Sequence, residues 1–541
     1  MTIKVTFHGA CGIVTGSCYE VRTAKAAVLI DCGMFQGTKS IKELNYAPFA
    51  FDVAKIDAVL LTHAHIDHCG LAPKLMKAGY KGAIVATRPT ADLLTYVLPD
   101  SGYVQETEVT RLNRRNRQRG RPPVEPIYCR ADGEACAKHV TPRASDKWFD
   151  AAPGIKARFW DAGHILGSAS IELLVEDGTS RKGQPLRLLF SGDIGTGDNM
   201  LQHPPRGPAD VDYLFVESTY GDRLRPKVTQ AQRSATVRRE IQAGLRAGGI
   251  ILIPAFAVER TQQLLFDLDY LFEHGQLPNL PVFVDSPLAT KATSVFAKYL
   301  RRAAGGAYAT AFSRPNLHFV EDADVSRKLS RLQSGAIIIA GSGMCDAGRI
   351  RHHLKNHLSN PTTTVLLVGY QAPGTLGRLL SQAVPMVRIH GEEIVVNARI
   401  RILGEYSGHA DQSGLVAWVR DRLPVAQNIF VVHGEEPARA GLSDALVAAG
   451  LPKGSLRLPQ IGETVRLTAS GAKTERIRSR VNVAAIATFD WHNAYADTVL
   501  ALRRSLDAAG SDGARQGLLR RMRALLNDAP TIQSKARSRH L

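Results

Sequence analysis

The sequence predicts an α/β protein in which a domain of stacked sheets is interrupted by a second domain of parallel βα units. Short apolar runs of strand length recur through residues 1–215, with few helix-like stretches between them. From about residue 222, helix-like and strand-like runs alternate regularly, as is typical of a parallel sheet covered by helices. Strand-rich sequence returns at 394–402. The second domain is therefore predicted to be an insertion covering residues 222–392.

Local composition predicts the individual elements. The strands predicted in the first domain are 5–7, 27–30, 58–61, 83–85, 171–175 and 187–190. Residues 106–118 predict a helix, because the run begins with acids, lacks Gly and Pro, and ends just before Gly120 and Pro122. In the insertion, helices are predicted at 230–247 and 259–272, and strands at 250–253, 282–284, 336–340 and 364–368.

A dense cluster of metal-ligand side chains follows the strand predicted at 58–61. The run Thr62-His63-Ala64-His65-Ile66-Asp67-His68 holds three imidazoles and one carboxylate. A buried strand that ends in a tight loop is a rigid platform for such nitrogen and oxygen ligands. A cluster of surface histidines is the alternative, but four candidate ligands at this density are hard to explain by chance. The run therefore predicts a metal site.

Three further candidate ligands lie on loops just past predicted strands. His164 lies in Asp161-Ala162-Gly163-His164, Asp193 in Ser191-Gly192-Asp193, and His433 follows the apolar run 429–432. Taken alone, either histidine could be structural and the aspartate could be a turn residue. Together they supply what two metal ions need, and the single carboxylate of Asp193 could bridge them.

These motifs, in this order, resemble those of the β-CASP family of nucleases, which includes bacterial and archaeal relatives of the eukaryotic pre-mRNA 3′-end cleavage endonuclease. Asp31, the group His63, His65, Asp67 and His68, then His164 and Asp193 match the four metal motifs of the family. Glu217, His409 and His433 match its motifs A, B and C, which separate it from lactamases and glyoxalases. The resemblance covers residues 1 to about 470.

The resemblance implies a fold and a domain division. The fold is a metallo-β-lactamase αββα sandwich with an inserted parallel α/β domain, the β-CASP domain. The implied division is 1–221 and 393–470 for the sandwich, 222–392 for the β-CASP domain, and 471–541 for a basic helical extension that the resemblance does not cover.

The resemblance also implies two zinc ions, one held by His63, His65 and His164, the other by Asp67, His68 and His433, with Asp193 as the bridge. Two such ions lower the pKa of a shared water and clamp the reacting phosphate. Asp67 is expected to be essential for catalysis. His409 is the expected general acid, since a histidine can hold a proton near neutral pH, and Glu217 would fix its ring. Asp31 is expected to orient a metal ligand by hydrogen bonding to it without touching the metal. A turn-forming role before Gly33 would also explain an aspartate at this position.

Two glycine-rich loops are candidates for substrate binding, because backbone amides at a helix N-terminus suit a phosphate. The first contains Ser342 and Gly343, and the second contains Gly374, Thr375 and Arg378. The arginine run 111–121 could guide a nucleic-acid strand or could be a solvated helix face. His352, His353 and His357 lack a partner carboxylate motif and are expected to be surface or packing residues.

Composition agrees with a polyanionic partner. The formal net charge is +18, which favours binding of a phosphate backbone such as that of RNA. The seven cysteines are scattered, as expected of a protein from a reducing cytoplasm. The N-terminus reads as a strand rather than a signal peptide, and no apolar run has the length of a membrane span. A homodimer stays open. In the extension, residues 499–506 and 518–526 read as amphipathic helices, and 535–540 reads as a disordered basic stretch. The role of the extension as a cap, an oligomer contact or an RNA-binding tail also stays open.

The expected function is that of a zinc-dependent ribonuclease, endo- or 5′–3′ exonucleolytic, which hydrolyses RNA phosphodiester bonds by two-metal catalysis in RNA processing or decay. It would leave a 5′-phosphate and a 3′-hydroxyl. A DNA repair nuclease of the same superfamily is one alternative, and His433 argues against it because the DNA-acting branch typically lacks this histidine. A non-catalytic RNA-binding subunit is another, and the full ligand set argues against it. A hydrolase of small esters would not need the large insertion.

Overall fold

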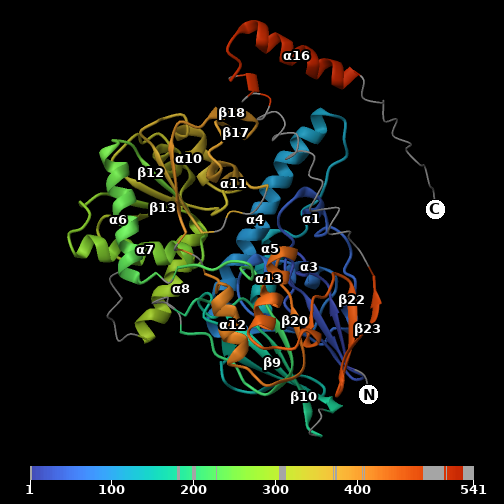
Figure 1. The fold of residues 1–541 in the computed structure, drawn as a ribbon. Helices are drawn as coiled ribbons and strands as arrows, with labels where there is room; N and C mark the ends of the chain where they lie inside the picture. Colours follow the sequence, from blue (N-terminus) through green and yellow to red (C-terminus); the bar gives the residue numbers. More distant parts are fainter. Residues whose placement is uncertain are drawn as a thin grey trace. The chain divides into compact units, whose positions relative to one another are not determined.

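The computed structural model is drawn as a ribbon in Figure 1 and divides into two units, Met1–Asn482 and Val483–Leu541, which are described separately. The residues described are 3–179, 183–197, 203–226, 228–303, 312–369, 371, 374–404, 406, 408–478, 502, 505–506 and 508–527. The expected helix at 499–506 and the basic stretch 535–540 lie wholly or largely outside them. Among the described residues, no helix is both long and apolar enough to cross a membrane.

The first sheet of the sandwich has eight strands. Its order is β23-β22-β1-β2-β3-β4-β5-β6. The strands are β1 (Ile3–Phe7), β2 (Tyr19–Arg22), β3 (Ala27–Ile30), β4 (Ala58–Leu60), β5 (Ala83–Thr87), β6 (Val140–Arg143), β22 (Glu463–Thr468) and β23 (Gly471–Ile477). Strand β1 pairs antiparallel with β22, so the beginning and the end of the unit meet in one sheet.

The second sheet has seven strands in the order β21-β20-β11-β10-β9-β8-β7. They are β7 (Phe149–Ala152), β8 (Ile155–Asp161), β9 (Ala169–Thr179), β10 (Pro185–Phe190), β11 (Val211–Val216), β20 (Val425–Val431) and β21 (Leu456–Arg457). Strand β11 pairs in parallel with both β10 and β20, although β20 lies about 200 residues later in the chain. The chain therefore returns to the sandwich after the insertion.

Aromatic side chains fill the space between the two sheets. Phe7 of the first sheet has its ring centroid 6.1 Å from that of Phe215 and 5.5 Å from that of Phe430, both of the second sheet. Phe190, Phe215 and Phe430 stack on one another across adjacent strands, with centroids 4.2 and 4.8 Å apart. Each ring buries a large apolar surface, so this stack fixes how the sheets face each other.

Helices cover the outer faces of both sheets, which confirms the predicted αββα sandwich. Leu75, Leu93 and Leu94 share a buried cluster with Leu29 and Val59 of the first sheet. On the second sheet, Leu415, Trp418 and Leu442 pack against strand residues in the same way. The helices are α1 (Lys39–Glu43), α2 (Ile66–Cys69), α3 (Ala72–Lys77), α4 (Arg88–Gln118), α5 (Arg130–His139), α12 (Gln412–Arg420) and α13 (Glu436–Ala448), with 3-10 turns η1 (Val53–Lys55) and η2 (Lys453–Ser455).

Helix α4 is much longer than the helix predicted at 106–118. It begins at Arg88 and continues through Pro99 and Gly102, two residue types that usually interrupt a helix. Burial of Leu93, Leu94 and Val97 outweighs the low helix propensity of those two residues. Gly102 is needed, because a Cβ there would lie 2.5 Å from the carbonyl oxygen of Cys129 at the start of α5.

The insertion contains a six-stranded sheet in the order β14-β13-β15-β12-β16-β19. Its strands are parallel, as predicted. Its strands are β12 (Ile251–Pro254), β13 (Val282–Asp285), β14 (Leu317–Phe319), β15 (Ile337–Ala340), β16 (Thr364–Val368) and β19 (Arg399–Leu403). Val237 and Leu264 lie in a core on one face of this sheet, and Leu354 and Leu380 lie in a core on the other. Helices therefore cover both faces.

The helices of the insertion are α6 (Gln230–Arg246), α7 (Arg260–Glu273), α8 (Pro287–Ala303), α9 (Ala323–Leu329), α10 (Ile350–His357) and α11 (Leu376–Ser381), and β17 (Met386–Ile389) forms a hairpin with β18 (Glu392–Val395). Helix α8 packs on the sandwich, because Val295 and Phe296 join the same cluster as Leu93. Lys298 Nζ also lies 2.6 Å from Asp92 Oδ2 of α4. The insertion and the sandwich are thus joined by apolar and ionic contacts.

Two predicted boundaries do not follow the sheets. Strand β19 lies beyond residue 392 yet pairs in parallel with β16, so the strand-rich run 394–402 does not mark the return to the sandwich. Strand β23 lies beyond residue 470 yet pairs with β22. Both edge strands have mixed polar and apolar residues, so their sequences do not indicate which strand they pair with.

In the second unit, the helix predicted at 518–526 lies within α16 (Asp512–Asn527).

Candidate metal centre

The predicted ligands lie where strands of the sandwich end. The 62–68 run follows β4, Asp193 follows β10, His433 follows β20, and His164 lies between β8 and β9. Asp31 and His433 have φ values of +62° and +50°, which is uncommon for residues other than glycine and concentrates at functional sites. The local backbone is therefore bent to turn these side chains inward.

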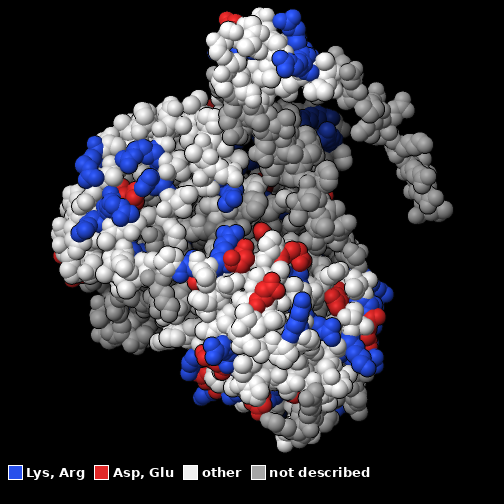
Figure 2. Space-filling model, viewed as in Figure 1, with Lys and Arg blue, Asp and Glu red and all other residues white. Residues whose placement is uncertain are grey.

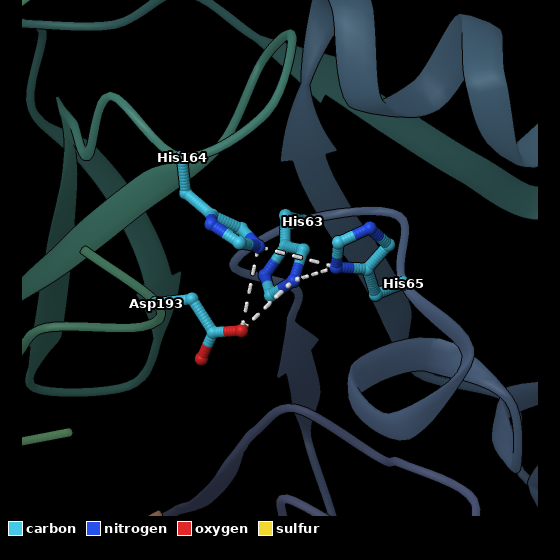
Figure 3. A group of neighbouring side chains, drawn as sticks. All are labelled: His63, His65, His164 and Asp193. Atoms are coloured by element: carbon cyan, nitrogen blue, oxygen red, sulfur yellow. Dashed lines mark hydrogen bonds and ion pairs between the residues drawn. The ribbon is translucent and has the colours of Figure 1, made fainter. Parts of the chain in front are cut away.

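One group consists of His63, His65, His164 and Asp193, whose ligand atoms all lie within 4.8 Å of one another. Figure 3 shows the three rings and the carboxylate pointing toward a common point. His65 Nδ1 lies 3.0 Å from His63 Nε2 and 3.2 Å from His164 Nε2. Asp193 Oδ2 lies 3.5 Å from the Nε2 atoms of both His63 and His164.

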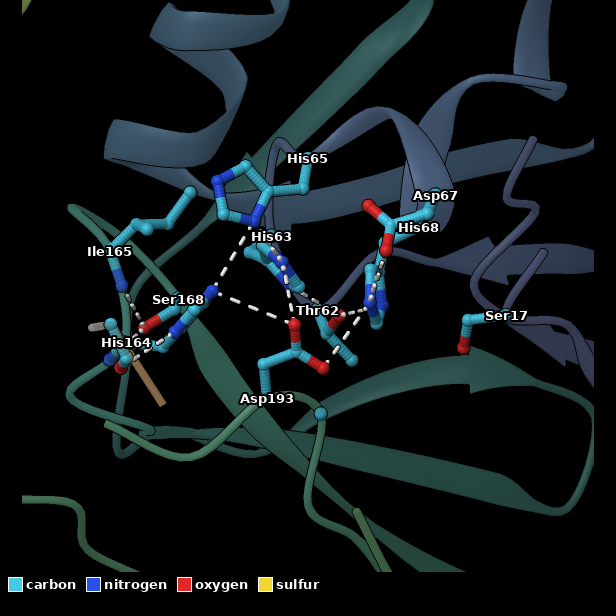
Figure 4. Close-up of polar contacts among 12 residues, drawn as sticks. Ser17, Thr62, His63, His65, Asp67, His68, His164, Ile165, Ser168 and Asp193 are labelled. Atoms are coloured by element: carbon cyan, nitrogen blue, oxygen red, sulfur yellow. Dashed lines mark hydrogen bonds and ion pairs between the residues drawn. The ribbon is translucent and has the colours of Figure 1, made fainter. Parts of the chain in front are cut away.

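A second group consists of Asp67, His68 and His433. The Nε2 atoms of the two histidines are 3.0 Å apart, and Asp67 Oδ2 lies 3.8 Å from His433 Nε2. The other oxygen of Asp193, Oδ1, lies 3.3 Å from His68 Nε2 and 3.5 Å from His433 Nδ1. Figure 4 shows Asp193 between His63 and His164 on one side and His68 on the other. Each group thus faces one oxygen of the same carboxylate.

The two groups fit divalent metal ions. Ligands bound tetrahedrally at about 2.0–2.1 Å from an ion lie about 3.3 Å from one another, close to the separations seen here. Asp193 Oδ1 is buried and accepts no well-aligned hydrogen bond from any described residue. A buried carboxylate oxygen left in this way is costly, and a cation between the two groups would satisfy it.

The electrostatics of the first group suit neutral imidazole ligands, which metal binding requires. Burial, together with the positive charge that neighbouring histidines can carry, lowers the pKa of His63 and His164 well below the usual value. Burial lowers the pKa of His65 to about 4. Burial alone would raise the pKa of Asp193, but His433, His68 and His63 outweigh it and lower that pKa well below its usual range. Three neutral rings therefore face an ionised carboxylate.

Asp31 lies behind His68 rather than in a free turn. Its Oδ2 is 2.7 Å from His68 Nδ1, and it also accepts hydrogen bonds from the Thr62 hydroxyl at 3.0 Å and the Ser17 hydroxyl at 3.1 Å. Its Oδ1 accepts from the Thr62 backbone amide at 2.8 Å. A carboxylate that holds Nδ1–H leaves the Nε2 lone pair of His68 directed toward the second group.

His409 and Glu217 form a pair at the edge of the first group. His409 Nδ1 lies 3.1 Å from Glu217 Oε1, and its Nε2 lies 3.9 Å from Asp193 Oδ2. Glu217 is fully buried and accepts hydrogen bonds from the amides of Ile194 and Thr219. Burial would lower the pKa of His409, but the Glu217 carboxylate, aided by Asp193 and Asp67, outweighs burial and raises it. His409 can therefore hold a proton on the side facing the metal groups.

Sequence reasoning missed several residues that position this centre. Ser168 accepts hydrogen bonds from the backbone amides of His164 and Ile165, and so fixes the His164 loop. Arg225 donates a short hydrogen bond to the His409 carbonyl. Glu259 accepts from the Leu166 amide at 3.3 Å and ties the insertion to the same loop. Ser168 follows the motif directly and could have been found, whereas Arg225 and Glu259 carry no local signal.

The two glycine-rich loops lie together at the carboxyl edge of the parallel sheet. The Gly377 amide donates to the Met344 carbonyl at 3.0 Å, and the Leu376 amide donates to Asp346 Oδ1 at 2.9 Å. Thr375 caps α11 by accepting from the Arg378 amide at 3.2 Å. No hydrogen bond or ion pair between the described residues joins either loop directly to the metal-ligand groups. Their role in substrate binding stays a prediction.

The three histidines of α10 lie in the insertion. His353 is buried, with Nε2 2.7 Å from Asp285 Oδ2, and His357 is buried one turn later. His352 is exposed and its ring lies 4.6 Å from that of His390. These residues are surface and packing residues, as expected.

Three family models match the chain. The metallo-beta-lactamase superfamily model matches residues 11–229, and the Beta-Casp domain model matches residues 261–380. The model of the Zn-dependent metallo-hydrolase RNA specificity domain matches residues 393–453. Together the three matched segments take in all the predicted ligands and His409.

The chain is also similar to named proteins over most of its length. It is 35% identical over 470 residues to Ribonuclease TTHA0252 of Thermus thermophilus, covering 86% of this chain and 100% of the relative. It is 30% identical over 464 residues to Transcription termination factor FttA of Methanosarcina mazei, covering 82% and 69%. It is 31% identical over 436 residues to the RNase J-like protein of Methanocaldococcus jannaschii, covering 80% and 93%.

Proposed function

The chain belongs to the β-CASP family of metallo-β-lactamase-fold proteins, and from this premise we propose that it is a zinc-dependent ribonuclease whose two ions share the carboxylate of Asp193. The family relationship supports a metal-dependent nuclease with RNA as its substrate. The observation that carries the two-ion proposal is the arrangement of the ligands. Two separate groups face the two oxygens of one buried carboxylate.

The proposed assignment follows the two groups. His63, His65 and His164 would hold one ion, Asp67, His68 and His433 would hold the other, and Asp193 would bridge them. When bound, two such ions would activate a water molecule for attack on phosphorus and would neutralise the charge on the phosphate oxygens. Asp67 is half-buried, whereas His68 is buried. Asp67 is proposed to be essential for cleavage as well as for binding the ion.

His409 is proposed to act as the general acid. Its Nε2 faces the metal groups, and its Nδ1 is held by Glu217 at 3.1 Å, which fixes the tautomer and favours the protonated ring. The proton on Nε2 would pass to the oxygen that leaves phosphorus, producing a hydroxyl on one RNA fragment and a phosphate on the other. Glu217 would serve to position the ring.

Substrate binding is proposed to involve the carboxyl edge of the parallel sheet. Ligands commonly bind at this edge in α/β proteins, and the loops holding Ser342, Gly343, Gly374, Thr375 and Arg378 lie there. Glu259, in the loop after β12 at the same edge, contacts the His164 loop. The seven cysteines are all free, which supports the proposal of a cytoplasmic location.

A direct test compares RNA with DNA. Protein purified with zinc is incubated with end-labelled single-stranded RNA and with DNA of the same sequence. Cleavage of RNA that stops with a chelator and returns with zinc is expected. Cleavage of DNA alone would favour a repair nuclease, and binding of RNA without cleavage would favour a non-catalytic subunit. Labelling at either end also separates endonucleolytic from 5′–3′ exonucleolytic cutting.

A further inference from the structure

Two buried arginines of the insertion flank the ring of Tyr406, but only one of them has a carboxylate partner. Arg233 forms two hydrogen bonds with Asp267, Nε to Oδ2 at 2.7 Å and Nη2 to Oδ1 at 3.0 Å. Its guanidinium carbon lies 5.5 Å from the centroid of Tyr406, and the Tyr406 hydroxyl donates to the same carboxylate. The charge of Arg233 is thus neutralised within the fold.

Arg260 also lies near the Tyr406 ring, but no carboxylate in the described chain pairs with it. It is the first residue of α7 and only 8% exposed, and its guanidinium carbon lies 5.9 Å from the Tyr406 centroid. Nη1 donates to Gln263 Oε1, a neutral acceptor, at 2.6 Å. Nε is buried and donates to no described acceptor, and no described carboxylate lies within ion-pair distance of this guanidinium.

This arrangement is costly for the protein alone. A charge taken out of water is costly unless a partner of opposite charge replaces the solvent. Burial, with a contribution from the nearby charge of Arg233, lowers the pKa of Arg260 to about 10, although Glu259 opposes this. The side chain therefore still carries its charge at neutral pH. Glu259 offsets part of this charge from a distance, but no described carboxylate pairs directly with the guanidinium.

Arg260 lies beside the metal centre. A Cβ built on Gly408 would lie 3.7 Å from Arg260 Nη2 and 3.1 Å from His164 Cε1, so both side chains lie close to Gly408. The Gly408 carbonyl accepts from His164 Nδ1 at 3.0 Å, and His409 is the next residue. An anion held by Arg260 would therefore sit next to the loop that carries the proposed acid.

We infer that Arg260 binds a phosphate of the RNA chain in the active site. This inference rests on the proposed function, because only a nucleic-acid substrate places phosphates beside His164 and His409. A phosphodiester carries one negative charge and two free oxygens, which match the planar fork of a guanidinium. Arg260 would be a substrate-binding residue, distinct from the metal ligands and from the acid.

The experiment combines Arg260→Gln with RNAs that each carry one uncharged methylphosphonate linkage, placed in turn along the chain. On all-phosphate RNA, Arg260→Gln should raise KM about 10- to 100-fold, the size of a lost charged hydrogen bond. Wild type should lose a similar amount with the methylphosphonate at one position. At that position, Arg260→Gln should lose little more, because the interaction is already absent. Equal sensitivity of both proteins at every position would overturn the inference.

Arg233→Gln is the matched control, since it removes a buried arginine from the same cluster. It removes the only ion-pair partner that the described residues give Asp267, so its melting temperature should fall, while its response to each methylphosphonate should match that of wild type. Arg260→Gln removes an unpaired charge, so its melting temperature without RNA should equal or exceed that of wild type. A fall as large as that of Arg233→Gln would instead assign Arg260 a structural role.

Two further measurements separate the possible failures. Arg260→Lys keeps the charge but not the fork, so it should fold and show the same position dependence with a smaller loss. Zinc content of all variants should stay at the wild-type value, because Arg260 holds no ion. If wild type itself cleaves no RNA, the proposed function fails; if wild type cleaves and Arg260→Gln cleaves equally well, only the present inference fails.

Discussion

At the scale of single residues, His409 lies between two carboxylates with different tasks. Glu217 contacts Nδ1 at 3.1 Å, whereas Asp193 lies 3.9 Å from Nε2 and belongs to the ligand groups. His409→Ala should therefore keep the bound metal and bind RNA about as well as wild type. Its cleavage rate should fall roughly 100- to 10,000-fold, the usual effect of losing a general acid. Single-turnover cleavage and elemental analysis of the same sample measure both.

A substrate with sulfur in place of the leaving oxygen separates the acid from a ligand. A thiolate leaves without a proton, so this RNA should restore much of the rate of His409→Ala. Glu217→Gln should resemble His409→Ala, because an amide cannot favour the protonated ring. His68→Ala serves as the contrast and should lose both metal and rate. Loss of zinc from His409→Ala, or no rescue by sulfur, would make His409 a ligand or a positioning residue.

Asp31 offers a second test at this scale. Its Oδ2 lies 2.7 Å from His68 Nδ1, with Thr62 and Ser17 completing its hydrogen bonds. Asp31→Asn should weaken metal affinity about 10- to 100-fold, the usual effect of changing the partner of a ligand histidine. Competition with a fluorescent chelator measures this affinity. Asp52→Asn, on an exposed 3-10 turn, should leave it unchanged. Equal affinity in Asp31→Asn and wild type would contradict the role of Asp31.

At the scale of elements, the sequence predicted those strands, helices and motifs that a short local pattern of residues specifies. Strands such as β16 and the parallel sheet of the insertion were predictable because their apolar runs are short and regularly spaced by helices. The two groups of candidate ligands were predictable as clusters because dense histidine and aspartate motifs follow buried strands. Helix α4 was not, because Pro99 and Gly102 are tolerated only through packing. Arg225 and Arg260 were not, because only the fold brings them to His409 and Gly408.

Helix α4 also carries a pH-sensitive carboxyl. Burial raises the pKa of Asp100 from its unfolded value near 3.8 to about 6, although Lys291 and Arg130 oppose this. The folded state thus binds this proton more tightly. The resulting stability is present below about pH 4 and is lost as pH rises through 6. Asp100→Asn should therefore be more stable than wild type at pH 8, by about 1–3 kcal/mol, and by only about a third of that at pH 4.5.

Denaturant unfolding of each variant beside wild type, at both pH values and with the same metal content, measures this effect. Asp132→Asn is the control of opposite sign. Burial would raise the pKa of Asp132, but the hydrogen bond from the Cys129 amide outweighs it and lowers that pKa, so Asp132 stabilises α5 at high pH. Asp132→Asn should lose stability at pH 8. An Asp100→Asn effect of the same size at both pH values would argue against a raised pKa for Asp100.

At the scale of the whole molecule, positive charge is unevenly distributed. Figure 2 shows Lys and Arg gathered with few acids on the visible face of the insertion, whereas acids and bases are mixed over the sandwich. The distal part of α4 and the following turn add Arg111, Arg114, Arg115, Arg117, Arg119 and Arg121. In the described chain none of these six pairs with a carboxylate, and Asn113 holds the turn through Val124. The run is therefore available for phosphates.

RNA binding should accordingly weaken as salt increases. Asp67→Ala, which should not cleave, allows affinity to be measured between low and physiological salt. Changing Arg114, Arg115 and Arg117 to Gln should flatten the slope of log affinity against log salt. For single-stranded RNA, the slope should change by about 0.7 for each phosphate that an arginine no longer neutralises. Arg130→Gln is the control, because Arg130 already pairs with Glu134 at 3.0 Å. An unchanged slope would leave the arginine run as a solvated helix face.

The central claim is that two metal ions share Asp193 and that both are needed to cleave RNA. It is tested most directly by adding zinc in steps to chelator-treated protein, with elemental analysis and RNA cleavage measured on the same samples. Two zinc ions per chain are expected at saturation, with cleavage appearing fully only as the second site fills. Full cleavage at zero or one ion per chain would contradict the claim.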